Sequence, residues 1–303
     1  MIRTRTIDAL AQVNTVPTIR HILFPYDGSE RGREIVANVR SLAARFGAHV
    51  TIIAVAPPTF TSAPEHAGLH LRVGVDVDEW KRHLQSELDQ VFVREFGDVT
   101  VERHADAGDP ALRIVDFAHH HDVDLIAMPT RGAGPFRSML VGSVAAKVLH
   151  DARCAVWTSA HADGRPTAGL PRHILCAVDG STNTPPLVNW AKGFAEAVGA
   201  TISLLHVVGT VSDFLALESE RRLQDEVREI ARVKIEKMLA TYDLQTPLRM
   251  AVGHVARTVA EEARQMDADL VIIDRGHASQ PFGRLRTNAL GIIQQSPCPV
   301  LSV

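Results

Sequence analysis

The chain has 303 residues, of which 46% are hydrophobic and 22% charged, and its formal net charge at pH 7 is −3. This length and composition are typical of a globular protein with two domains of ordinary size. The near-neutral charge excludes the general basic surface by which proteins bind nucleic acids or anionic membranes.

The chain has three cysteines, all within apolar segments, and no two of them form a C-x-x-C pair. This pattern indicates reduced cysteines in the core of a cytosolic protein. No apolar run reaches membrane-spanning length, and residues 1–19 have no apolar core of the kind found in signal peptides. We therefore expect a cytoplasmic protein with no membrane partner and an N-terminal arm at residues 1–19.

The first half of the chain alternates between strand-like and helix-like segments, which predicts a parallel sheet with helices on both faces and ligands beyond the carboxyl ends of the strands. An irregular insert rich in Pro, His and Gly occupies residues 57–73. The expected strands are residues 20–26, 49–55, 99–105, 124–128 and 154–158, and the expected helices are residues 29–46, 76–96, 109–121 and 142–150.

The second half repeats the first. The segment HILFPYDGS at residues 21–29 returns as HILCAVDGS at residues 173–181, an offset of 173 − 21 = 152. A period of this length predicts two whole domains in tandem and not a solenoid. The predicted boundaries are residues 20–160, a polar linker at 161–171 and residues 172–303. In the second domain, residues 213–241 form a long helix with a charged, solvated face.

A glycine-containing segment joins the strand ending at Met128 to the helix after Gly142. Glycine lets the backbone approach a ligand closely, and the unpaired N–H groups at a helix start favour an anion. The segment predicts a loop for nucleotide phosphates, although a plain connecting turn with Ser143 capping the helix remains the alternative. The glycine patterns of P-loops and dinucleotide-binding folds are absent from the chain.

Together these motifs resemble the universal stress protein family, specifically its tandem members, over residues 20–303. The resemblance implies an α/β fold of two tandem doubly wound domains. Each domain would have a five-stranded, mainly parallel sheet with helices on both faces, as in the adenine nucleotide α-hydrolase-like group. The segments that carry the resemblance are ILFPYDGS at residues 22–29, VTIIAV at 50–55, AGDPALRIV at 107–115, DLIAM at 124–128 and GSVAAKVL at 142–149.

Nucleotide-binding members of the family have the pattern Gly, two residues, Gly, nine residues, Gly, then Ser or Thr. This chain matches from the second glycine onward, whereas Pro129 stands at the first glycine and removes a backbone donor there. The resemblance implies that the N-terminal domain binds ATP or another adenine nucleotide, with Mg²⁺ as an accompanying ion. Matched by position, the nucleotide-binding residues would be Asp27, Val55, Met128, Arg131, Gly132, Gly142, Ser143 and Val144.

Within that set, Asp27 would lie by the adenosine and the backbone of Val55 by the adenine, while Arg131 would pair with a phosphate. For Asp27 the alternative is a turn-forming Asp-Gly pair. The second domain has Arg286-Thr287 where the first has Gly142-Ser143. Because a bulky side chain blocks close backbone approach, we expect a degenerate loop that does not bind ATP. The alternative is that the Arg286 cation itself contacts a phosphate.

Three further polar patterns favour neither a metal site nor a catalytic set. Neighbouring residues in His119–His121 point about 100° apart on a helix and cannot share one ion. His66 and His70 lie in the insert without a carboxylate partner, and the alternation of Glu102, His104 and Asp106 fits an exposed edge strand. We therefore expect no enzyme beyond slow ATP hydrolysis.

The sequence is compatible with three hypotheses for function. The first is a nucleotide-dependent sensor or regulator in stress adaptation that also engages a protein partner. The second is an interaction scaffold without nucleotide, which uses residues 57–73 and 213–241, and the third is a nucleotide-processing enzyme of the same superfold. The apolar last strands of the two domains would pair as an intrachain pseudo-dimer, which protects both edges, and further association into a homodimer stays open.

Overall fold

The computed structural model describes residues 17–56, 77–130, 141–159, 169–209, 218–275 and 287–303. The chain divides into an N-terminal unit, residues 19–156, and a C-terminal unit, residues 157–303 with residues 17–18. No helix in this part of the chain is long and apolar enough to cross a membrane.

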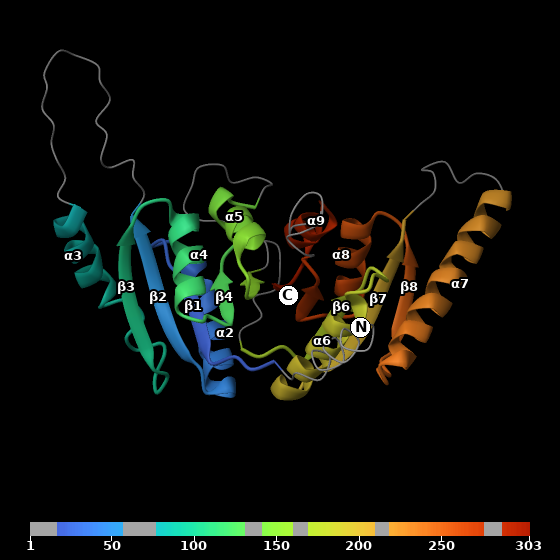
Figure 1. Cartoon of the computed structure of the whole chain (residues 1–303), viewed down its shortest axis with the longest axis horizontal. Helices are drawn as coiled ribbons and strands as arrows, with labels where there is room; N and C mark the ends of the chain where they lie inside the picture. The colour runs from blue at the N-terminus through green and yellow to red at the C-terminus, as the bar shows by residue number, and fades with distance from the viewer. Residues whose placement is uncertain (1–16, 57–76, 131–140, 160–168, 210–217, 276–286) are drawn as a thin grey trace, which may run out of the picture. The chain divides into compact units, whose positions relative to one another are not determined.

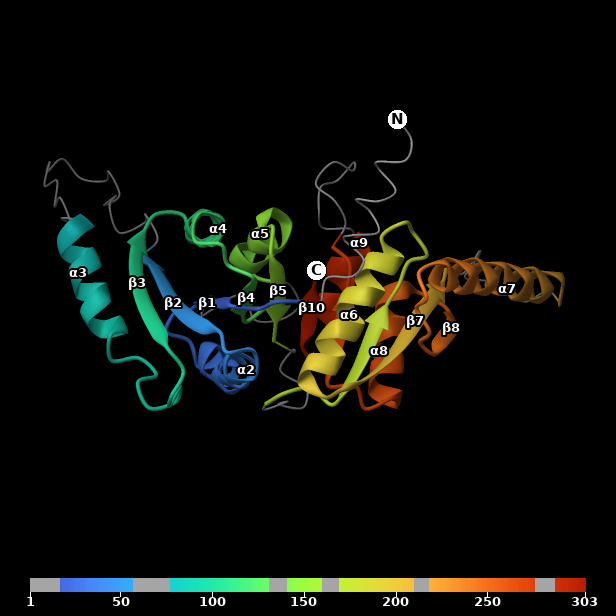
Figure 2. The same cartoon turned by 60° about the horizontal axis from the view of Figure 1, so that its bottom comes forward.

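The N-terminal unit is an open parallel sheet with the strand order β3-β2-β1-β4-β5. Strand β1 pairs in parallel with β2 and β4, and β2 pairs in parallel with β3. Helix α2 covers one face of the sheet and helices α4 and α5 cover the other (Figure 2). The elements are β1 (His21–Pro25), α2 (Glu30–Phe46), β2 (His49–Ala56), α3 (Val77–Leu88), β3 (Val101–Ala107), α4 (Pro110–His120), β4 (Leu125–Met128), α5 (Ser143–Asp151) and β5 (Ala155–Thr158), the last of which crosses the unit boundary.

Local sequence signals explain the helix boundaries. Ser29 caps α2 by accepting a hydrogen bond from the Gly32 N–H at 3.2 Å, and Gly47 ends the helix with a left-handed φ of 64°. Asp109 caps α4 through the Leu112 N–H at 3.0 Å, directly before Pro110. The central strands β1 and β4 are buried throughout, so their apolar side chains form the core between the helix layers.

The C-terminal unit repeats this architecture with the strand order β10-β9-β6-β7-β8. Figure 1 shows α7 lying along β8, as α3 lies along β3. The predicted fold of two tandem parallel α/β domains is confirmed. The elements are β6 (His173–Ala177), α6 (Thr184–Val198), β7 (Thr201–Val208), α7 (Glu218–Thr241), β8 (Leu248–Val252), α8 (Val255–Gln265), β9 (Leu270–Ile273), α9 (Thr287–Gln295) and β10 (Val300–Ser302).

One predicted helix is wrong in its extent. The segment 76–96 was expected to be helical throughout, yet α3 ends at Leu88. Phe92 then adopts a positive φ of 54° and buries its ring against Tyr26 and Phe24, at centroid distances of 4.9 and 5.9 Å. This tertiary contact, which a continuing helix would not allow, overrides the local helical pattern. The predicted insert at residues 57–73 lies outside the described residues.

Candidate functional site

The strand order of the N-terminal unit reverses between β1 and β4. From β1 the chain moves outward to β2 and β3, and it then returns to β4 on the other side of β1. In open α/β sheets, ligands bind in the crevice beyond the carboxyl ends of the strands at such a switch point. Asp27 follows the end of β1 and Met128 ends β4, so both predicted residues lie at the carboxyl edge of the sheet, beside the switch point.

The structure describes six of the eight predicted site residues. Asp27 is exposed and accepts a hydrogen bond from the Ser29 N–H at 3.1 Å, so it makes the turn contact that was the alternative interpretation for it. Val55 is partly buried at the end of β2, and Met128 is buried. Arg131 and Gly132 lie outside the described residues.

The remaining three residues form the start of α5. Gly142 is the N-cap residue and makes no side-chain capping bond. The alternative interpretation, in which Ser143 caps the helix, is therefore wrong, because Ser143 is the first helical residue. The Gly142 N–H donates to the Thr130 carbonyl at 2.9 Å, which joins the two ends of the glycine-containing loop. Ser143 is exposed and Val144 partly exposed, so the positive end of α5 is accessible to an anion.

The C-terminal unit has a cavity of about 240 Å³ at the carboxyl ends of β6, β7 and β9. Four of its lining residues stand at positions equivalent to predicted site residues of the first half: Asp179, Val207, Ile273 and Asn288 correspond to Asp27, Val55, Met128 and Val144. The sequence pattern alone did not indicate this cavity, because the loop motif is lost in the second copy.

Asp274 distinguishes this second cavity from the first half, whereas Asp179 is the counterpart of Asp27. Asp274 replaces Pro129 directly after the strand and accepts a hydrogen bond from Asn183 Nδ2 at 3.0 Å. Asp179 accepts from the Ser181 N–H at 2.9 Å, and both aspartates line the cavity. The additional carboxylate of Asp274 opposes a polyphosphate, since like charges repel strongly where water is partly excluded.

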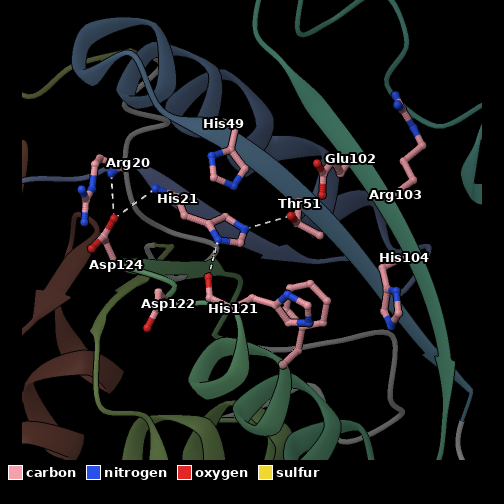
Figure 3. Close-up of a pocket in the computed structure, with 11 residues that line it drawn as sticks. Arg20, His21, His49, Thr51, Glu102, Arg103, His104, His121, Asp122 and Asp124 are labelled. Atoms are coloured by element: carbon pink, nitrogen blue, oxygen red, sulfur yellow. Dashed lines mark hydrogen bonds between the residues drawn. The ribbon is translucent and has the colours of Figure 1, made fainter.

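A larger cavity, of about 490 Å³, lies at the opposite edge of the N-terminal unit, near the amino ends of its strands (Figure 3). It is formed between the sheet and the carboxyl end of α4. The lining residues are Arg20, His21, His49, Thr51, Glu102, Arg103, His104, Phe117, His121, Asp122 and Asp124.

Four histidines from four places in the chain meet in this amino-edge cavity. The His21 ring stacks on His49 at a centroid distance of 4.0 Å, and His121 stacks on Phe117 at 4.0 Å. His104 packs against Phe117 at 5.0 Å. The parallel register explains the meeting, because His21 lies opposite His49 and His104 lies opposite Ile53 on the same face.

Hydrogen bonds select one tautomer of the neutral His21 ring. Its Nδ1 lies 2.9 Å from the His121 carbonyl, which can only accept, so Nδ1 carries the hydrogen and donates it. In the neutral ring Nε2 then accepts from the Thr51 hydroxyl at 2.9 Å. Burial lowers the pKa of His21 below its ordinary value, and burial lowers the pKa of His104 in the same way.

The chemistry of this cavity is polar and aromatic. Within the described residues no group of three or more His, Cys, Asp or Glu side chains is placed to hold a metal ion. Glu102 is exposed on β3, which is an edge strand as predicted. Asp106 is drawn away from this cluster into ion pairs with Lys81 at 3.0 Å and Arg113 at 3.7 Å.

Comparison with known proteins identifies the fold and its duplication. The model of the universal stress protein family matches residues 18–159 and again residues 171–303. The chain belongs to the universal stress protein family. A universal stress protein from Methanocaldococcus jannaschii is 30% identical over 138 residues, which cover 45% of this chain and 79% of that protein. Another from Thermus aquaticus is 28% identical over 132 residues, covering 43% of this chain and 96% of that protein.

A solved structure extends the likeness to both halves. A universal stress protein from Archaeoglobus fulgidus covers 93% of this chain, and the match spans 97% of that chain, with 19% identity and a TM-score of 0.66. At this identity the likeness concerns the fold. The tandem fold of this universal stress protein is therefore shared with a solved relative.

Proposed function

We propose that the N-terminal unit binds an adenine nucleotide, with ATP as the expected ligand, and that the protein acts in the cytoplasm as a nucleotide-dependent sensor in stress adaptation. The observation that carries the proposal is the position of α5: its uncapped amino end follows β4, beside the switch point between β1 and β4. Backbone N–H groups at a helix start bind phosphate without needing a cationic side chain.

The two ends of a nucleotide would meet different parts of the carboxyl edge of the sheet. The partly buried end of β2 at Val55 suits the flat, mainly apolar face of a base, and exposed Asp27 suits ribose hydroxyl groups. The phosphates would extend toward Gly142, Ser143 and Val144. When bound, Mg²⁺ would offset phosphate charge.

For the C-terminal unit we propose a cavity that does not take ATP. Asp274, which stands where the first half has Pro129, opposes the charge of a polyphosphate. Asn288 occupies the position equivalent to Val144 near the start of α9. The two units then have different roles. The N-terminal unit binds nucleotide, whereas the C-terminal unit retains the fold without binding ATP and provides surface for contacts with a partner.

A matched pair of substitutions tests this assignment. Val144→Glu and Asn288→Glu place a carboxylate at the second residue of α5 and of α9, where an acidic side chain favours the helix itself. In calorimetric titrations with ATP, ADP and adenosine, we expect Val144→Glu to weaken ATP binding at least ~10-fold through repulsion of the phosphates. Adenosine binding should change less, and Asn288→Glu should leave ATP binding as in the wild type.

The alternatives predict different results in the same titrations. Absence of heat with every nucleotide in the wild type would favour the scaffold hypothesis, and rapid release of phosphate would favour an enzyme. Loss of ATP binding in Asn288→Glu but not in Val144→Glu would place the site in the C-terminal unit and overturn the assignment.

A further inference from the structure

Helix α7 has two apolar faces, of which the C-terminal unit uses one. Ile235 and Leu239 are 1% and 3% exposed and pack toward the sheet edge at β8 and β7. On a different side of the helix Leu223, Ile230 and Val233 are 48%, 68% and 54% exposed. The sequence pattern indicated a solvated charged face on this helix, and the exposed apolar stripe was not recognised.

The exposed stripe runs along one side of α7. With about 100° per residue, positions 223, 226, 227, 230, 233, 234 and 237 fall within one third of the helix circumference. Its apolar members are Leu223, Val227, Ile230 and Val233, and its charged members are Glu226, Lys234 and Lys237. This is the narrow seam spacing of a helix that packs against another helix.

Two of the three charged residues on this stripe are placed symmetrically about Ile230. Glu226 lies four residues before it and Lys234 four residues after it. If a second copy of α7 packs antiparallel with Ile230 at the centre, each Glu226 faces a Lys234 of the second copy. In a parallel pair the same residues would face themselves and repel.

The apolar residues of the stripe also make contacts in an antiparallel pair centred on Ile230. In the antiparallel pair Ile230 meets Ile230 of the second copy. On the two flanks of the seam, Val227 lies beside the aliphatic stem of Lys234 of the second copy, and Val233 lies beside that of Glu226. Leu223 meets Lys237, whose aliphatic stem covers apolar surface while its amine stays in water. The ion pairs that α7 forms among its described side chains involve neither Glu226 nor Lys234: they are Asp225–Arg228, Glu229–Arg232 and Arg232–Glu236.

We propose that the exposed stripe of α7 is a self-association surface, on which two copies of this chain pair through antiparallel α7 helices centred on Ile230. The second copy is the occupant because the stripe is complementary to itself in both charge and apolar content. A contact formed by one helix from each chain is small, so we expect a weak dimer with a dissociation constant on the order of 1–100 μM.

Charge reversal on the full-length protein tests the proposal. Sedimentation equilibrium should show dimers that dissociate on dilution for the wild type. Glu226→Lys and Lys234→Glu should each weaken association at least ~10-fold, because each creates two like-charge pairs at the seam. The double variant Glu226→Lys/Lys234→Glu should restore association, since every pair is again of opposite sign. Glu236→Lys, an equal charge change off the stripe, should leave association unchanged.

Ile230→Asp and Ile230→Cys complete the test. Ile230→Asp should yield monomers whose circular dichroism spectrum and thermal midpoint match the wild type, because this side chain contributes little to the monomer core. Ile230→Cys chains should form a disulfide between two copies, because the two residues 230 meet at the centre of the antiparallel pair. A monomeric wild type at every concentration, a dimer that survives Ile230→Asp, or a double variant no better than the single ones would each overturn the proposal.

Discussion

The Asp124 side chain ties the start of β1 to the start of β4, with its Oδ2 2.7 Å from the backbone nitrogen of Arg20. The same oxygen accepts the His21 N–H at 3.1 Å. Asp269 repeats the contact in the C-terminal unit, where its Oδ2 accepts from Arg172 and His173 at 2.9 and 3.0 Å. One carboxylate in each unit therefore fixes the strand pair at the switch point.

We expect Asp124→Ala to destabilise the N-terminal unit by about 1–3 kcal/mol, because two backbone donors lose a charged acceptor. Hydrogen exchange followed by mass spectrometry should show faster exchange in β1 and β4 while β6 and β9 keep their protection. Asp269→Ala is the matched control and should show the reverse. If either variant increased the rate of hydrogen exchange equally in both units, the proposed local role of each carboxylate would be contradicted.

The stability of the N-terminal unit should fall as the pH drops below about 6.5, the ordinary pKa of histidine. Burial lowers the pKa of His21 and of His104 in the folded state, so below pH 6.5 the unfolded chain binds protons that the folded chain does not. Stability continues to fall with decreasing pH until the pH is below the folded-state pKa values of both histidines. The neighbouring charged or titratable groups are His49, Glu102 and Asp124 around His21, and Asp106, Lys81 and His121 around His104.

Urea unfolding between pH 7.5 and 5 measures this dependence. His104→Gln should flatten the loss of stability on acidification, because one proton-linked group is removed, and His21→Gln should do the same. If both variants kept the wild-type slope, these buried rings would not be the groups responsible.

Gln85 protects the outer edge of the sheet. Its Nε2 donates to the Arg103 carbonyl at 3.0 Å and its Oε1 accepts from the Ala105 N–H at 2.8 Å, so it satisfies edge groups of β3. Gln85→Ala should cost about 1–2 kcal/mol and leave the edge open to pairing with other chains. Light scattering during heating should show earlier aggregation than in the wild type. Ser86→Ala, an exposed neighbour on the same helix, should not aggregate earlier.

The three cysteines should differ in reactivity. Burial raises the pKa of Cys176 and of Cys298 to about 12, whereas Cys154 is partly exposed. Because the thiolate is the reactive form, iodoacetamide at pH 8 should label Cys154 in the folded protein and all three cysteines in urea. Rapid labelling of Cys176 without denaturant would show that the core of β6 opens readily.

The sequence by itself determined the elements and their duplication. Alternating apolar strands and capped helices are local patterns, so the starts of α2 at Glu30 and of α4 at Pro110 follow from Ser29 and Asp109. The order of strands and helices then implies a parallel sheet, and its carboxyl edge gathers Asp27 and Met128. These inferences require only local sequence patterns and the general rules of α/β topology.

Only the tertiary structure decided which distant side chains meet. The amino-edge cavity joins His21, His49, His104 and His121, which no sequence spacing connects, because strand register and the packing of α4 set their contacts. The end of α3 at Leu88 depends on a buried site for Phe92 beside Tyr26. On α7, the side chosen for packing on the sheet leaves Ile230 exposed, since a helix with two apolar sides can bury only one within its own unit.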